Sequence, residues 1–369
     1  MNLDLLYKIA FASVRGMGVD LARKMLEVIG EEKEFFNISE KALREITGSK
    51  SKILEKAYRN SCISKAENEM EFLESRHIRI SYFTDPDYPQ RLLNATDAPI
   101  LLYSVGNTHL NGKHFVSIVG TRNCTEYGKR MCEKLVSELA EAVPDVVIVS
   151  GLAFGIDIVA HNAALKNNVL TIGVQACGLN KIYPSENRNT AESIVKSGGC
   201  IMTEYTSQDH LHKGNFVARN RIIAGITDGT IVIESAEKGG SLITANLAQG
   251  YNRDVFAVPG RAGDEYSKGC NNLIKRNQAM MVTCAADIIE TLQWESKKPR
   301  RNAVQLDLFP TLTPEEETVM KIIQKSGDIH INHITEKLHM PVYKVMSTLM
   351  QLEFKGVIIS MPGCRYTMA

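Results

Sequence analysis

The sequence predicts an α/β fold: an extended Rossmann-like, doubly wound parallel sheet with a helical N-terminal domain and a C-terminal winged helix. Two adjoining units support the sheet, each an apolar run that ends in a glycine loop and is followed by a helical pattern. This alternation is typical of parallel strands with crossover helices. A third observation is the change, after residue 311, to a compact pattern of short helices.

The first unit has a strand over residues 115–119, a loop that contains Arg122, and a helix over 126–142. The second has a strand over 146–149, the loop 150–157, and a helix that ends near residue 166. Ligands bind at the carboxyl ends of such strands, where helix N-termini attract phosphate. The loops therefore predict an anion site, although tight turns alone would also use these glycines.

Composition limits the classes of function. The 369 residues are 44% hydrophobic and 23% charged, with a formal net charge of +1, so a polyanion site must come from local clustering. The eight cysteines include no Cys-x-x-Cys pair, which excludes zinc ribbons and thioredoxin-like motifs. No stretch reaches the ~18 apolar residues of a membrane span. We expect a cytoplasmic protein with reduced thiols.

The chain divides into four predicted parts. Residues 1–75 are helical, and a Gly-x-Gly turn at Gly16 and Gly18 is similar to a helix-hairpin-helix or to an ordinary turn in a small SAM-like bundle. Residues 76–295 form the sheet domain, with 76–110 as its entry. Later strands are expected at 170–174, 200–204, 229–234 and 254–258. Residues 296–310 are predicted to form a basic linker, and residues 311–369 are predicted to form the winged helix.

The winged helix begins with a capping box, in which Thr313 precedes Pro314 and Glu316. Two further helices and a hairpin complete it. Its presumed recognition helix offers Lys344 alone before Lys355, whereas a DNA reader needs several cations or amides. We expect this module to contact protein, or DNA weakly.

The densest polar stretch is 209–221. It places Lys213 and Phe216 before Arg219 and Arg221, two arginines that point in different directions on a helix. Cations beside an aromatic ring suit single-stranded nucleic acid, because the ring stacks on a base at roughly 1–3 kcal/mol and tolerates any sequence. The alternative is a core phenylalanine with arginines in surface ion pairs.

Gly240 and Ser241 open another glycine loop, which supplies amides and hydroxyls for a phosphate. The loop at 183–187 could contribute to the same edge. Neither a P-loop nor a Gly-x-Gly-x-x-Gly fingerprint occurs, so we expect no ATP, NAD or other cofactor. No metal site can be assembled. Asp157 and His161 lie on one helical face and could form a general base, or a structural hydrogen bond.

These motifs resemble the DNA-processing protein A (DprA/Smf) family. The likeness spans about residues 80–290, with the motifs in the family's order. It is carried by Val119-Gly120-Thr121-Arg122, Ser150-Gly151-Leu152-Ala153-Phe154-Gly155-Ile156-Asp157, Tyr183-Pro184, Phe216 with Arg219-Asn220-Arg221, Gly240-Ser241-Leu242, Phe256-Ala257-Val258-Pro259-Gly260 and Gly269-Cys270-Asn271-Asn272.

The resemblance implies a non-enzymatic homodimer that binds single-stranded DNA without sequence preference. It further implies that the protein loads RecA recombinase onto that strand, during natural transformation or other recombination. The implied DNA-binding residues are Arg122, Gly151, Lys213, Phe216, Arg219, Arg221, Gly240 and Ser241. Double-stranded DNA should bind poorly, because a base must unstack to reach Phe216.

The chain departs from the family pattern at two positions. Thr121 replaces the usual serine and keeps the hydroxyl, and Phe154 replaces the usual arginine and removes a cation from the pocket edge. One alternative function is that of the Rossmann-like nucleotide N-glycosidases, whose Pro-Gly-Gly-x-Gly-Thr-x-x-Glu loop corresponds here to 237–244, without the proline and the glutamate. Another is a scaffold whose loops hold no ligand.

Overall fold

The computed structural model describes residues 2–48, 51–76, 78–107, 111–112, 114–295 and 312–368. The chain forms two compact units, residues 1–299 and 300–369. The predicted linker at 296–310 lies outside the described residues. Within the described parts, no helix is both long and apolar enough to cross a bilayer.

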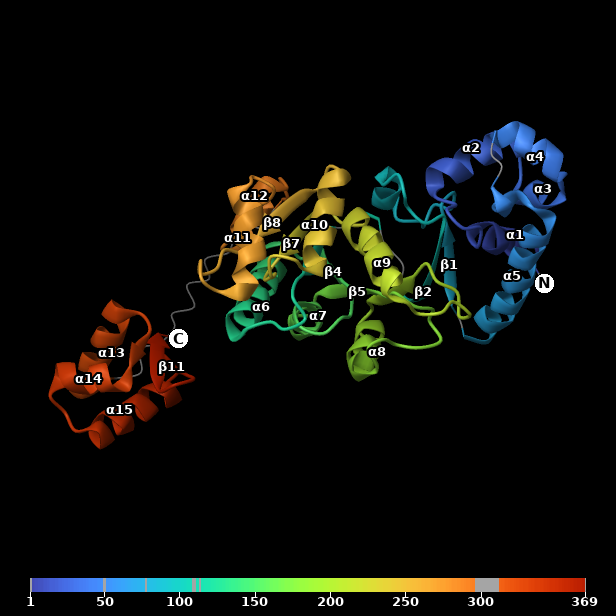
Figure 1. Ribbon diagram of the computed structural model, residues 1–369. Helices are drawn as coiled ribbons and strands as arrows, with labels where there is room; N and C mark the ends of the chain where they lie inside the picture. The colour runs from blue at the N-terminus through green and yellow to red at the C-terminus, as the bar shows by residue number, and fades with distance from the viewer. Residues whose placement is uncertain are drawn as a thin grey trace. The chain divides into compact units, whose positions relative to one another are not determined.

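The first unit is built on a nine-stranded sheet in the order β1-β2-β6-β5-β4-β3-β7-β8-β9 (Figure 1). The predicted doubly wound α/β class is confirmed. Every pair of neighbouring strands from β6 across the sheet to β9 in this order is parallel. The strands are β1 Arg79–Tyr82, β2 Leu101–Gly106, β3 His114–Val119, β4 Val146–Ser150, β5 Leu170–Val174, β6 Cys200–Thr203, β7 Gly229–Val232, β8 Asp254–Ala257 and β9 Met280–Met281.

The edge formed by β1 and β2 differs from the rest of the sheet. Strand β2 runs antiparallel to both β1 and β6. The sequence predicted strands in this entry segment but not their direction, because the direction is set by how the N-terminal helices return the chain to the sheet.

Helices cover both faces of the sheet. Alternate residues of β4 separate the two layers: Val146 and Ile148 face one core, and Val147 and Val149 face the other. Helices α6, α7, α8 and α12 pack on the first face, and α9, α10 and α11 on the second. They are α6 Glu126–Ala142, α7 Ile156–Lys166, α8 Arg188–Lys196, α9 Lys213–Gly225, α10 Gly240–Gly250, α11 Lys268–Lys275 and α12 Ala285–Thr291.

The N-terminal helices share one continuous core with the second face of the sheet. Arg59 anchors them: it is 1% exposed and donates hydrogen bonds to the carbonyls of Phe35, Ile38 and Leu54. A buried arginine is stable only where its donors find acceptors. The helices are α1 Leu3–Ala12, α2 Val19–Ile29, α3 Glu32–Asn37, α4 Glu40–Thr47 and α5 Lys56–Arg76.

The second unit has the three helices and the hairpin of a winged helix. Its predicted capping box is present, since Thr313 accepts from the amide of Glu316 and the Glu316 carboxylate accepts from the amide of Thr313. The elements are α13 Pro314–Ser326, β10 Ile329–His330, α14 Ile331–Leu338, α15 Val342–Phe354, β11 Ile358–Met361 and β12 Arg365–Met368.

Helix α15 is the one in the position of a recognition helix. Lys344 pairs with Glu315 at 2.8 Å, so its charge is already matched within the unit. The exposed side of α15 instead carries large apolar side chains: Val342, Tyr343, Met346, Met350 and Phe354.

Candidate functional site

Strand β3 lies at the centre of the sheet, between β4 and β7. The chain runs outward from β3 through β4, β5 and β6, then crosses back to β7 and continues to β9. A crevice at the carboxyl ends of the strands forms where the strand order reverses in this way. A cleft of about 550 Å³ opens there, between the loop after β3 and the first turns of α9 and α10.

Three cations surround this cleft: Arg122 after β3, Lys213 at the start of α9, and Lys238 before α10. All three residues are exposed. None has an acidic partner within ion-pair distance among the described residues. The cleft therefore concentrates positive charge that no ion pair within the described parts of the chain neutralises, which favours an anionic ligand.

Aromatic rings line the same wall of the cleft. The guanidinium of Arg122 lies 5.5 Å from the centre of the Phe216 ring. The centres of the Tyr183 and Phe216 rings are also 5.5 Å apart, and the planes of these two rings are tilted by 55° to each other. Phe216 is partly buried and Tyr183 is 45% exposed. The alternative of a core role for Phe216 is thus not observed, because its ring lies in the lining of the cleft between a cation and a second ring.

Arg219 forms the floor of the cleft. It is 4% exposed, and its Nη1 donates to the carbonyl of Val174 at 2.8 Å. The guanidinium packs against Gly151 so closely that a Cβ on that glycine would lie 1.8 Å from Nη1. Burial lowers the pKa of Arg219, and the Asp157 carboxylate opposes that shift. Arg219 and Gly151 thus support the floor beneath the exposed cations, and their direct contact with phosphate stays a prediction.

Asp157 stabilises the loop after β4. Its Oδ2 accepts from the amides of Gly151 at 3.1 Å and Ala153 at 3.4 Å. Burial raises the pKa of Asp157, and Arg219 opposes the rise. The amide of Gly151 is therefore already used, and it is not free for a ligand.

His161 does not pair with Asp157. Its Nδ1 is hydrogen-bonded to Thr171 Oγ1 at 2.7 Å, and the side chain is fully buried beneath the sheet edge. Burial, with a smaller contribution from Arg219, lowers the pKa of His161 to about 3. Of the two sequence interpretations, the structure favours a structural hydrogen bond, although with a threonine rather than the aspartate.

The N-terminus of α10 faces the cleft. Gly239 is its N-cap, Gly240 its first residue, and Ser241 donates to Ser235 Oγ at 2.9 Å. A Cβ added at Gly240 would meet nothing within 4 Å, so the N-terminal end of α10 is open at this residue. Three successive amides at the positive end of a helix suit a phosphate oxygen.

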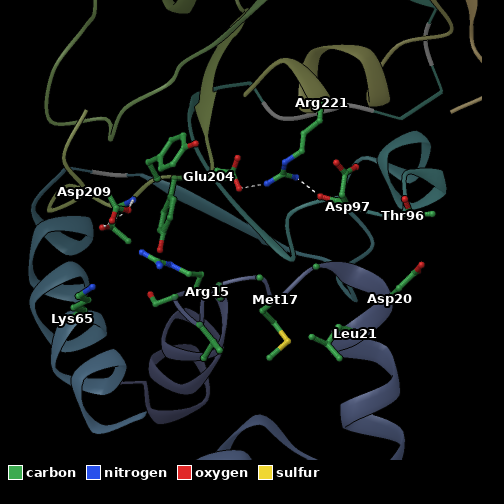
Figure 2. A pocket seen from close by; sticks show the side chains of 18 of the residues that line it. Arg15, Met17, Asp20, Leu21, Lys65, Thr96, Asp97, Glu204, Asp209 and Arg221 are labelled. Atoms are coloured by element: carbon green, nitrogen blue, oxygen red, sulfur yellow. Dashed lines mark hydrogen bonds and ion pairs between the residues drawn. The ribbon is translucent and has the colours of Figure 1, made fainter. Parts of the chain in front are cut away.

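Arg221 lies outside this cleft. Its guanidinium binds the Glu204 carboxylate and the carbonyl of Asp97 (Figure 2). These groups line a separate cavity of about 720 Å³ between the N-terminal helices and the sheet, where Asp20, Asp97, Glu204 and Asp209 offset the charges of Arg15, Lys65 and Arg221. Arg221 is therefore not brought together with Arg122 in this cleft, because its position two residues after Arg219 places its side chain on another face of α9. This arrangement does not support the expected place of Arg221 in the DNA site.

The cleft also contains residues that we did not predict individually. Tyr183 comes from the loop whose contribution to this edge was expected, and Asn220 and Lys238 complete the wall. Lys238 could have been found from its position directly before the glycines of the loop at 239–240. In the described parts of the chain, no group of three or more His, Cys, Asp or Glu could hold a metal ion.

Fold and cleft together define a class: a Rossmann-like α/β protein with an anion-binding cleft at the switch point and a winged helix. Two family models match, "DNA recombination-mediator protein A" over residues 79–293 and "DprA winged helix domain" over residues 308–364. This chain belongs to the DprA/Smf family, as the sequence motifs predicted.

Relatives support this assignment along the whole chain. Protein Smf from Synechocystis sp. is 33% identical over 401 residues, which cover 99% of both chains. DNA processing protein DprA from Streptococcus pneumoniae is 40% identical over 57% of this chain and 73% of its own. The X-ray structure of that pneumococcal protein matches 79% of this chain and 98% of its own, with a TM-score of 0.66 and 32% identity.

A second solved structure is DNA processing protein A from Helicobacter pylori. It has 35% identity and a TM-score of 0.53, and the match covers 60% of this chain and 99% of that one. That structure gives insights into a unique single-stranded DNA binding mode of the Helicobacter pylori protein.

Proposed function

We propose that this protein, as a recombination mediator in the cytoplasm, captures single-stranded DNA in the cleft at the switch point. The observation that carries the proposal is the ring of unpaired cations, Arg122, Lys213 and Lys238, around Phe216 and Tyr183. Cations hold a phosphate backbone whatever its sequence, and rings stack on any base. The Helicobacter pylori relative has a single-stranded DNA binding mode, which supports the same ligand here.

The phosphate contacts are assigned to Arg122, Lys213, Lys238 and the amides at Gly240 and Ser241. Phe216 stacks on one base, with Tyr183 at its edge. Because the base must leave its partner to reach Phe216, duplex DNA of the same length binds less tightly. Binding depends steeply on salt, since each neutralised phosphate releases counterions.

The test is a salt titration of a fluorescent oligothymidylate, followed by anisotropy. The salt slope is the slope of the logarithm of the binding constant against the logarithm of the salt concentration. Lys213→Ala reduces the magnitude of this slope by about 1, whereas Phe216→Ala weakens binding without changing the slope. Lys196→Ala is the matched control, because that lysine is 79% exposed on α8, away from the cleft. If both cleft variants bind like wild type, the proposal is wrong.

We also infer that a homodimer of this protein loads RecA recombinase onto the captured strand. Membership of the family supports this step. The measurement is the rate of RecA filament assembly on single-stranded DNA with and without the protein, alongside its mass by sedimentation. A rate that this protein leaves unchanged would contradict the loading role.

A non-enzymatic role fits the chemistry of the cleft better than nucleotide hydrolysis. Among the described residues that line it, Asp157 is the one carboxylate, and its Oδ2 is held by two loop amides. A glycosidase needs a positioned acid beside the sugar. Release of free base from nucleoside monophosphates, followed by chromatography, would overturn this assignment.

The apolar side of α15 supports a protein contact for the winged helix. An exposed stripe of this kind is typical of interaction surfaces, and Lys344 is already paired. We therefore assign DNA capture to the cleft and not to α15. Lys344→Ala in the full chain should leave the salt slope for single-stranded DNA unchanged.

A further inference from the structure

Phe154 is exposed at the edge of the cleft. It is 44% exposed and lines a second hollow of about 540 Å³, whose walls also include Arg122, Lys129 and Ile158. Arg122 lines both this hollow and the cleft. The two hollows therefore lie on either side of one arginine, and each contains an aromatic ring.

The backbone fixes Phe154 beside Arg122. Gly155 has a φ of 76°, and a Cβ there would lie 2.2 Å from the carbonyl oxygen of Thr121 and 2.6 Å from Cα of Arg122. The amide of Ile156 donates to the same Thr121 carbonyl at 3.2 Å. The loops after β3 and β4 are thus in direct backbone contact, which places the backbone of Phe154 next to that of Arg122.

The chemistry of the second hollow matches that of the cleft. Lys129 on its wall is 42% exposed and pairs with Glu126 at 2.6 Å, whereas Arg122 has no ion pair among the described residues and lines both hollows. A phosphate on Arg122 would lie between the cleft that Phe216 lines and the hollow that Phe154 lines. This is the arrangement that two successive bases of a single strand require, with the sugar-phosphate between them.

We propose that Phe154 is a second stacking platform for single-stranded DNA, which holds the base that follows the one on Phe216 across Arg122. The inference rests on the proposed function, since it extends the path of the strand beyond the cleft.

The test is a series of oligothymidylates of increasing length with the full chain. In wild type the affinity rises at the length where the strand reaches the second hollow. Phe154→Ala binds the shortest oligonucleotides like wild type and loses roughly 5-fold or more on the longer ones, with an unchanged salt slope. Phe216→Ala loses affinity at every length.

Phe154→Arg separates stacking from charge. It should steepen the salt slope by about 1, because it adds a cation that can contact a phosphate. An abasic site scanned along the oligonucleotide gives a second readout: one position weakens wild type but not Phe154→Ala. Phe354→Ala, which removes a phenylalanine that is 88% exposed on α15, is the matched control.

The outcomes separate the two proposals. If Lys213→Ala and Phe216→Ala lose binding while Phe154→Ala matches wild type at every length, the cleft stands and the second platform is refuted. If none of these variants changes binding, the cleft itself is not the DNA site. A salt slope flattened by Phe154→Ala would also refute stacking, because a phenylalanine contacts no phosphate through charge.

Discussion

The guanidinium of Arg122 lies 5.5 Å from the centre of the Phe216 ring, and the two residues come from different crossover units of the sheet. Arg122 follows β3, and Phe216 is on the first turns of α9, the helix that returns the chain to β7. The pair therefore spans the switch point. A phosphate and a base can be held at once only because both loops end at the same sheet edge.

Substitutions at Arg122 separate its charge from its shape. Arg122→Ala should reduce the salt slope of oligonucleotide binding by about 1. Arg122→Lys keeps the charge but loses the planar group over the Phe216 ring, so the slope stays and the affinity falls by about 0.5–1 kcal/mol. Anisotropy titrations at several salt concentrations measure both. A lysine variant with the flattened slope of the alanine variant would contradict this assignment.

Two glycines of the site should respond differently to alanine. A Cβ at Gly151 would lie 1.8 Å from Arg219 Nη1, whereas one at Gly240 would meet nothing within 4 Å. Gly151→Ala should therefore cost about 1–3 kcal/mol of unfolding free energy through overpacking. Gly240→Ala, in the first turn of α10, should change it by less than about 1 kcal/mol.

Urea unfolding of both variants measures the difference, and each is the control for the other. Equal midpoints would show that Arg219 moves aside without cost, and the supporting role of that arginine would then be wrong.

Local patterns predicted the sheet and its glycine loops because the relevant signals are contiguous: an apolar strand, a tight turn and a helix start. The same patterns brought Arg122, Lys213, Phe216, Gly240 and Ser241 to one edge, since parallel strands share their carboxyl end. What they could not give is which polar side chains are already satisfied. That depends on partners distant in sequence.

The arginines of α9 illustrate this limit. Arg219 finds the carbonyl of Val174, and Arg221 finds Glu204, a residue on the other side of the helix. Periodicity showed that the two diverge, but not which of them faced the ligand edge. In the structure Arg219 lies buried in the floor of the cleft, Arg221 lies outside the cleft, and Lys238, which was not predicted, is exposed at its wall.

The buried His161 should make stability depend on pH. Burial lowers its pKa from 6.5 to about 3, so between these values the unfolded chain binds a proton that the folded chain does not. The stability associated with neutral His161 is therefore complete above about pH 6.5 and is lost as the pH falls toward 3. This residue contributes a slope of up to about 1.4 kcal/mol per pH unit in that window.

Unfolding free energies of wild type and His161→Phe, measured from pH 7 to pH 4, test this. The variant should lose part of the acid dependence, whatever its stability at neutral pH. His333→Gln, at an exposed position of the winged helix, should keep the wild-type slope. Parallel pH profiles for wild type and His161→Phe would be inconsistent with a buried neutral imidazole.

Arg221 should matter for stability and not for DNA. Its guanidinium joins α9 to Glu204 at the end of β6 and to the carbonyl of Asp97 (Figure 2). Arg221→Ala leaves Glu204, whose side chain is 16% exposed, without its cation, and should cost about 1–3 kcal/mol of unfolding free energy. The folded fraction should keep the wild-type salt slope, because the residue lies outside the cleft.

Glu204→Gln with Arg221→Ala should recover part of the loss, since the double variant leaves no buried charge unpaired. A flattened salt slope in Arg221→Ala, at protein concentrations where it is fully folded, would return this arginine to the DNA site.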